Sequence, residues 1–262
     1  MADDLRPFLR RMIELQRRNP RLGLLQYENL LTAGRYADLF RLVLRRWDRS
    51  ARILDWGCGN GHFSLFLAEH GFRPHVFSLD EPPPALEALG AGRCEFRRGD
   101  KREPTALPYP DGFFDAVVSV GVLEHVREFG GSEIASLTEI RRILKPGGAF
   151  VGSHIPNRWS WVESLSLAFP GKHHHRWRFT RRSIRRLFAQ AGFAAVEARS
   201  TGFLPRWLMS RCPASLADAG LLAAAYESLD DALELIFPWF CTNLLCLGVR
   251  DGIPASTNPS TP

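Results

Sequence analysis

The residues in this chain best suited to chemistry form a short run in which glycine alternates with other residues after an acid. Asp55 is followed by Gly57, Gly59 and Gly61, and an apolar pair stands before it at 53–54. Glycine is needed where the backbone must adopt a positive φ or let a ligand approach closely. The ligand crevice of an open parallel sheet lies beyond the carboxyl end of such a strand. The pattern therefore predicts a buried strand, a tight turn beside a ligand, and a helix.

A glycine turn of this kind serves more than one class of cofactor, and some such turns only link a strand to a helix. The dinucleotide fingerprint, Gly-x-Gly-x-x-Gly, requires glycine at its sixth position. Counted from Gly57, that position is His62, so the dinucleotide pattern fails. A purely structural turn stays open as the alternative.

Two further acids stand where the next predicted strands end. The strand at 75–79 ends at Asp80, which lies 23 residues after Gly57, and the strand at 94–99 ends at Asp100. A carboxylate at the first of these positions can accept hydrogen bonds from both hydroxyls of a ribose. We therefore expect Asp80 to hold a sugar, although exposed loop aspartates are common in proteins of every class.

A fourth strand is predicted at 116–120, because its unbroken apolar run suits a strand that is covered on both faces. Glu124 and His125 follow directly after it. A helix at 134–144, a Lys-Pro-Gly-Gly turn and a strand at 149–155 come next. The proline and glycines of that turn stop the helix sharply, and we assign them no chemistry.

In this order, the motifs resemble those of the class I S-adenosylmethionine (SAM)-dependent methyltransferases, in particular the broad type 11 group. The stretch 114–126, which ends in Leu-Glu-His-Val, and the turn at 145–148 match that family closely. The resemblance covers about residues 50–200 and implies that SAM is the cofactor and that its methyl group passes to an oxygen, nitrogen or carbon atom. It also implies that Asp100 accepts a hydrogen bond from the adenine amino group. The cofactor-binding residues expected in this way are Asp55, Gly57, Cys58, Gly59, Gly61, Asp80, Asp100, Ser119 and Val120.

The resemblance does not identify the acceptor, and the residues near the transferable methyl leave several hypotheses open. The candidates for a general base are His125, His173 and His174, each of which could instead be structural. The candidates for contact with the acceptor are Tyr27, Glu124, Trp159 and Trp177. Adjacent histidines point apart in most backbone states and no other ligand cluster is evident, so no metal site is expected.

Composition places the chain among ordinary globular proteins, with 45% hydrophobic and 24% charged residues in 262. The net charge of +6 could favour nucleic acid, anionic lipid or a phosphorylated substrate. Because only three residues are lysine, an arginine-rich composition explains that charge as well. Five cysteines without a Cys-x-x-Cys pair argue against a disulfide framework. With no signal-like segment and no apolar run of about 18 residues, we expect a cytoplasmic protein.

The alternation of strands and helices predicts a Rossmann-like, doubly wound α/β sheet of seven strands. We expect a helical N-terminal cap at 1–50, a SAM-binding core at 51–201, a helical insertion or lid at 202–241, a last core strand at 242–250, and a disordered tail at 251–262. The insertion is rich in leucine and aromatic residues. It could cover the acceptor pocket, lie on a membrane surface, form a homodimer face, or simply extend the core.

The function predicted from these motifs is methyl transfer from SAM to a small or lipidic acceptor. RNA is the alternative acceptor, suggested by the arginines, but no separate RNA-binding module is evident and nucleic acid is not the expected partner. A non-catalytic SAM-binding scaffold is the alternative from another class. Peripheral contact with a membrane and homodimer formation stay open.

Overall fold

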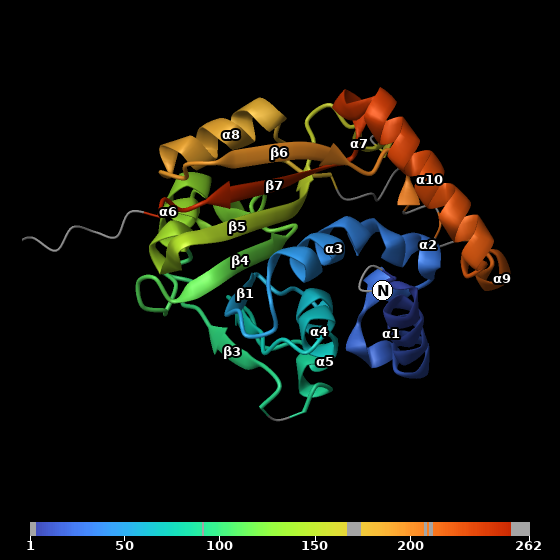
Figure 1. Ribbon diagram of the computed structural model, residues 1–262, viewed down its shortest axis with the longest axis horizontal. Helices are drawn as coiled ribbons and strands as arrows, with labels where there is room; N and C mark the ends of the chain where they lie inside the picture. Colours follow the sequence, from blue (N-terminus) through green and yellow to red (C-terminus); the bar gives the residue numbers. More distant parts are fainter. Residues whose placement is uncertain (1–3, 91, 167–173, 207–208, 210–211, 253–262) are drawn as a thin grey trace, which may run out of the picture.

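The computed structural model describes residues 4–90, 92–166, 174–206, 209 and 212–252, and a seven-stranded sheet runs through its centre (Figure 1). The strand order is β3-β2-β1-β4-β5-β7-β6. The first five strands are parallel, while β7 runs antiparallel to both β5 and β6. The prediction of a doubly wound α/β sheet of seven strands is therefore confirmed. The strands are β1 (Ile53–Trp56), β2 (His75–Ser78), β3 (Glu95–Arg98), β4 (Phe114–Val120), β5 (Leu144–Pro156), β6 (Val196–Thr201) and β7 (Asn243–Val249).

Alternate residues of the central strands enter two separate apolar cores, one on each face of the sheet. Val118 of β4 packs with α3 (Ala37–Arg46) and α4 (His62–Glu69). Its neighbour Val117 packs with α6 (Glu133–Ile143) and α8 (Arg181–Gln190) on the other face. Successive side chains of a strand point to opposite faces, so a strand covered on both sides must be apolar throughout. The apolar run at 116–120 has this physical cause.

The N-terminal segment packs on the face that α3 and α4 cover. Its first helix, α1 (Arg6–Arg18), brings Phe8 to the rings of Phe40 and Phe66, which stack with centroids 3.9 Å apart. Shorter elements connect α1 to α3. They are η1 (Pro20–Leu22), η2 (Leu25–Tyr27), α2 (Leu30–Ala33) and η3 (Gly34–Tyr36). The remaining short elements of the core are α5 (Pro84–Glu87), η4 (Val126–Phe129) and α7 (Trp161–Ser166).

The insertion after β6 contains α9 (Ala214–Ala217), α10 (Gly220–Ile236) and η6 (Pro238–Phe240). A buried ion pair anchors it, with Arg206 Nη2 2.8 Å from Asp230 Oδ2. Arg206 also donates to the carbonyl oxygen of Leu31 in α2, at 3.1 Å. The ion pair closes the insertion on itself, and the bond to Leu31 ties it to the N-terminal cap.

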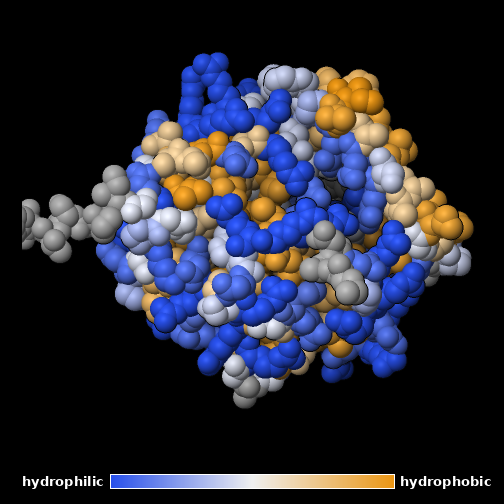
Figure 2. All heavy atoms as spheres, viewed as in Figure 1, coloured by the Kyte–Doolittle hydropathy of each residue, from blue (hydrophilic) through white to orange (hydrophobic). Residues whose placement is uncertain are grey.

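The outer side of α10 carries apolar side chains that are open to solvent. Leu221 is 85% exposed and Leu235 is 84% exposed. Figure 2 shows orange, apolar atoms along the edge of the molecule that α10 occupies in Figure 1. Among the residues that the structure describes, no helix is long and apolar enough to cross a membrane. The tail predicted to be disordered lies, from residue 253 onward, outside the described residues.

Two glycines of the first turn separate the effect of close packing from that of backbone strain. A Cβ atom on Gly57 would lie 2.7 Å from a methyl group of Val122, whereas one on Gly59 would meet no atom within 4 Å. Both glycines have a positive φ. Because overpacking adds about 1–3 kcal/mol, we expect Gly57→Ala to lower the free energy of unfolding by that much more than Gly59→Ala. Urea denaturation measures both, and equal losses would contradict the packing shown here.

Candidate functional site

The glycine turn after β1 lies where the strand order reverses, between β1 and β4, and it is open to a ligand. The backbone N–H of Gly57 donates to the carbonyl of Phe77 at 2.8 Å, which ties the turn to β2. Gly57, Gly59 and Gly61 have φ of +75°, +52° and +83°. The space beside Gly59 is empty, so a ligand can approach its backbone. A switch point of this kind is the ligand crevice of open α/β sheets.

Asp55, the acid before the turn, holds two elements together. It is 1% exposed, and its carboxylate accepts a hydrogen bond of 2.6 Å from the Ser64 hydroxyl on α4. Burial raises the pKa of Asp55 to about 7, against the lowering effect of that hydrogen bond. The side chain predicted to contact the cofactor therefore lies inside the protein and fixes the position of α4 relative to β1.

Asp80 and Asp100 stand at the same edge of the sheet, after the neighbouring strands β2 and β3. Both are exposed. Asp80 Oδ1 lies 2.6 Å from Lys101 Nζ, and Asp100 Oδ1 accepts from the backbone N–H of Arg102 at 2.9 Å. On β4, the buried hydroxyl of Ser119 has no hydrogen-bond partner in the described part of the chain. Exposed carboxylates and an unpaired buried hydroxyl fit a ligand rich in hydroxyl and amino groups, as a nucleoside is.

A cavity of about 590 Å³ begins beside the end of β4. The N-terminal cap contributes Arg35 and Tyr36 to its wall, and the end of β4 contributes Val120 and Gly121. On the side of the insertion, α10 contributes four acids. They are Glu227, Asp230, Asp231 and Glu234. The cavity thus lies between the sheet edge, the cap and the insertion, and its lining is largely polar.

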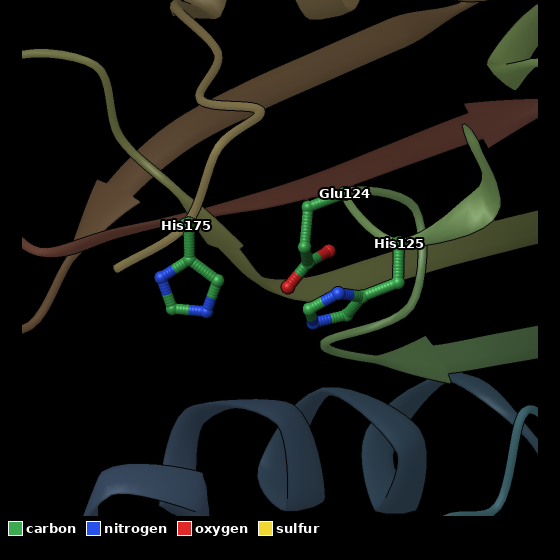
Figure 3. Close-up of side chains that lie close together, drawn as sticks. All are labelled: Glu124, His125 and His175. Carbon is green, nitrogen blue, oxygen red and sulfur yellow. The ribbon is translucent and has the colours of Figure 1, made fainter. Parts of the chain in front are cut away.

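Three side chains of the cavity wall lie close together: Glu124, His125 and His175 (Figure 3). One ligand atom from each lies within 4.8 Å of the other two. Glu124 is 2% exposed, and its Oε2 has no hydrogen-bond partner among the described residues. Burial raises the pKa of Glu124 to about 7, while the two histidines act to lower it. The group can bind a proton or a cation.

Each histidine of this group is backed by a second carboxylate. His125 Nδ1 lies 3.0 Å from Glu128 Oε2, and His175 Nδ1 lies 3.2 Å from Glu163 Oε1. The contact with Glu163 raises the pKa of His175, and Glu124 and Glu128 act in the same direction. The carboxylates fix the orientation of both rings.

Other residues predicted to face the acceptor lie elsewhere. Tyr27 is fully buried, and its hydroxyl donates to the backbone carbonyl of His62 at 3.1 Å. Trp159 is 57% exposed, and Trp177 lines a separate groove, where the guanidinium of Arg127 covers its ring. These three aromatic residues do not line the 590 Å³ cavity. His174 is half-buried and is not part of its wall, and His173 lies outside the described residues.

The cavity wall contains residues that the sequence did not single out. Tyr36 replaces Tyr27 there, and its ring stacks on that of His154 with centroids 4.4 Å apart. His154 has φ +58° beside an irregularity in the pairing of β5 with β7, which turns its side chain into the cavity. No local pattern marks it. The acids of α10 did carry a signal, because 227, 231 and 234 repeat at helical spacing on one face.

The fold and the ligand crevice together define a class I SAM-dependent methyltransferase. A family model described as "Methyltransferase domain" matches residues 31–198, so the chain belongs to that family. It is 36% identical over 151 residues to the demethylmenaquinone methyltransferase of Thermus thermophilus, a match that spans 52% of this chain and 62% of that enzyme. It is 27% identical over 213 residues to a Mycolicibacterium smegmatis protein named as a probable S-adenosylmethionine-dependent methyltransferase, across 70% of this chain and 79% of that one.

Solved structures show the same fold. The phosphoethanolamine N-methyltransferase 2 of Haemonchus contortus, in complex with SAM, superposes with a TM-score of 0.56 at 17% identity. The superposition covers 82% of this chain and 53% of that one. With the family established, SAM is the cofactor of this enzyme, and the open glycine turn and the exposed acids fit it.

Burial of Asp55 has a consequence for stability that can be measured. Its pKa is about 7 in the folded state and 3.8 in the unfolded state, so the folded protein holds the proton more tightly. The contribution of Asp55 to stability is therefore highest at low pH and falls as pH rises from about 4 to 7, by at most about 1.4 kcal/mol per pH unit. We expect Asp55→Asn to flatten this part of the pH profile of the unfolding free energy. An unchanged profile would show that Asp55 does not hold its proton in the folded state.

Proposed function

We propose that this chain transfers the methyl group of SAM to a small acceptor held in the 590 Å³ cavity. The cavity itself carries the proposal, because it begins at Val120 and Gly121, beside the cofactor crevice, and has walls on three sides. The demethylmenaquinone methyltransferase among the relatives is a precedent for a small acceptor. SAM, when bound, supplies a methyl group on a sulfonium sulfur that is already electrophilic. What the protein adds is alignment of the two reactants, which can contribute about 7–11 kcal/mol.

The charges of the cavity favour a polar acceptor over a polyanion. Seven carboxylates line it, against four arginines. The arginines are partly neutralised, since Arg206 pairs with Asp230. A nucleic-acid backbone brought into this cavity would be repelled by the acids of α10. RNA is therefore the less favoured acceptor, in spite of the net charge of the whole chain.

Glu124 is the residue best placed to take a proton from the acceptor. It lines the cavity, its Oε2 is buried, and its pKa of about 7 lies near neutral pH, where a general base works best. His125 and His175 stand beside it and would stabilise the charged carboxylate. We propose that the reacting atom of the acceptor carries an ionisable proton, as a phenol, a carboxylic acid or an amine does.

The apolar outer side of α10 and the five free cysteines bear on where the enzyme works. Free thiols are typical of a reducing compartment, and we propose the cytoplasm as the site of action. Contact of α10 with a membrane surface or a second copy of the chain would cover its exposed leucines. Cell fractionation and sedimentation of the purified protein test these assignments.

The proposed contact of Asp80 with the ribose predicts a loss of cofactor affinity. We expect Asp80→Ala to weaken binding of S-adenosylhomocysteine by about 10–100-fold. A loss of this size corresponds to the free energy that hydrogen bonds to a charged group contribute to binding. Isothermal titration calorimetry measures it. The matched control is Glu81→Ala, which removes the adjacent exposed acid and should leave affinity unchanged. Equal affinities for both variants would contradict the assignment of Asp80.

The proposed role of Glu124 predicts a loss of turnover without a loss of cofactor. We expect Glu124→Gln to lower kcat by about 10²–10⁴-fold, because the amide cannot accept the proton. The assay follows S-adenosylhomocysteine release over a panel of phenols, carboxylic acids and amines. In the wild type, activity should rise with pH through about 7, since Glu124 must be deprotonated, and this rise should be absent in the variant.

The matched control for Glu124 is Glu197→Gln, which changes an exposed glutamate on β6 outside the cavity. It should retain wild-type turnover and pH dependence. A Glu124→Gln enzyme with unchanged kcat would contradict the assignment of Glu124 as the proton acceptor. Binding of S-adenosylhomocysteine without turnover on any acceptor of the panel would favour the non-catalytic scaffold instead.

A further inference from the structure

The group formed by Glu124, His125 and His175 has the composition of a metal site. It joins one carboxylate and two imidazoles, a donor set that zinc and other divalent first-row ions bind in enzymes, with further positions left open for a substrate. Two of the residues come from the loop after β4, and His175 comes from the segment that follows α7. Figure 3 shows the Glu124 carboxylate between the two rings. The chain thus brings together donors that are fifty residues apart in sequence.

The surroundings of the two histidines are those of metal ligands. Nδ1 of His125 faces Glu128, and Nδ1 of His175 faces Glu163. Each carboxylate favours the tautomer with the proton on Nδ1, which places the lone pair on Nε2. In Figure 3 one ring nitrogen of His175 lies on the side of Glu124 and the other lies on the far side. A histidine that binds a metal through one nitrogen usually donates from the other nitrogen to a carboxylate, a backbone carbonyl or a water.

Glu124 supplies the negative charge. Its Oε2 is buried and has no hydrogen-bond partner among the described residues. A buried acceptor without a partner is unfavourable, the more so when it is charged, and a bound cation removes that cost. The ligand atoms lie up to 4.8 Å apart, against about 3.0–3.5 Å around one ion with bonds near 2.1 Å. Side-chain rotations that move the ligand atoms by about one to two ångströms close that difference.

We propose that Glu124, His125 and His175 bind one divalent first-row metal ion, such as zinc, at the wall of the acceptor cavity. Imidazole donors favour such ions over magnesium and calcium, which prefer oxygen. The further role of the ion rests on the proposed function: facing the cavity, it would bind an oxygen atom of the acceptor and favour its deprotonated form. With the ion in place, Glu124 is a ligand, and without it Glu124 accepts the proton itself.

The test begins with the metal alone. Protein stripped with a chelator is titrated with Zn²⁺, Co²⁺ and Mg²⁺ in the absence of SAM. We expect one equivalent of Zn²⁺ or Co²⁺ to bind, and Mg²⁺ to bind at least 100-fold more weakly. Bound Co²⁺ should show visible d–d absorption without the sulfur-to-metal charge-transfer band that cysteine ligands produce. Absence of stoichiometric Zn²⁺ and Co²⁺ binding would overturn the proposal.

Ligand variants locate the ion. His175→Gln and Glu124→Gln should each weaken Co²⁺ affinity by at least 100-fold, whereas His70→Gln, which changes a histidine outside the cavity, should not. Each variant is checked for unchanged affinity for S-adenosylhomocysteine, which separates loss of the site from loss of the fold. Equal Co²⁺ affinity in the wild type and in His175→Gln would place the ion elsewhere and overturn the proposal.

Glu163 offers a finer test as a positioning residue. Glu163→Gln leaves the three ligands in place but removes the carboxylate that orients His175, so we expect metal affinity to fall about 10–100-fold. A merely structural role for Glu163 would leave the Co²⁺ spectrum and affinity unchanged, and that result would contradict the proposed arrangement.

If the ion binds as expected but no acceptor is methylated, the proposed function fails while the site stands. Transfer that proceeds at full rate in metal-stripped enzyme would reject the role of the ion and leave the proposed function intact.

Discussion

The close approach of Gly57 to Val122 joins the glycine turn to the loop that lines the 590 Å³ cavity. These residues lie in the loops that follow β1 and β4, the two strands between which the sheet reverses its order. Because position 57 has no side chain, Val122 can pack where a Cβ atom would stand. Two residues further along the same loop, Glu124 enters the wall of the acceptor cavity. This apolar contact and the pairing of β1 with β4 together fix the glycine turn relative to the loop that carries Glu124.

The side of the cavity that the insertion forms depends on an ion pair. Arg206 and Asp230 form an ion pair that is almost fully buried, with side chains 10% and 2% exposed. The desolvation of such a pair is expensive unless further hydrogen bonds satisfy both partners. Here Asp230 also accepts from the backbone N–H groups of Phe203 and Leu204, and Arg206 reaches the carbonyl of Leu31. The pair thus positions Arg206 to hold the insertion against the cap, on one side of the cavity.

The features that could be predicted from the sequence are those that depend on a few neighbouring residues. The glycine turn, the acids after β2 and β3, and the apolar strands follow from backbone conformation and from burial on both faces, and the structure places all of them as expected. Asp55 shows a limit of such reasoning, since its place in the motif suggested a ligand contact while its burial makes it an internal link to Ser64. A motif identifies the position of a residue, but only the surrounding packing decides where its side chain points.

The acceptor side could not be predicted in this way, because tertiary contacts decide it. Tyr27 and Tyr36 lie nine residues apart in the same cap, yet the first is buried against Phe8 and His62 while the second lines the cavity. Trp159 and Trp177 in the segment after β5 were expected to contact the acceptor, yet Trp159 is exposed, neither residue lines the cavity, and the lining is largely polar. His175 reaches Glu124 across fifty residues of sequence, a distance at which no spacing rule applies.

The proposed reaction requires the cofactor crevice and the cavity to meet at the end of β4, so that the methyl group faces the acceptor there. A crystal structure of the protein with S-adenosylhomocysteine tests this most directly. We expect the ribose to lie on Asp80 and the sulfur atom to point past Val120 into the cavity, toward Glu124. A sulfur atom directed away from that cavity, or a nucleoside bound at another edge of the sheet, would contradict it.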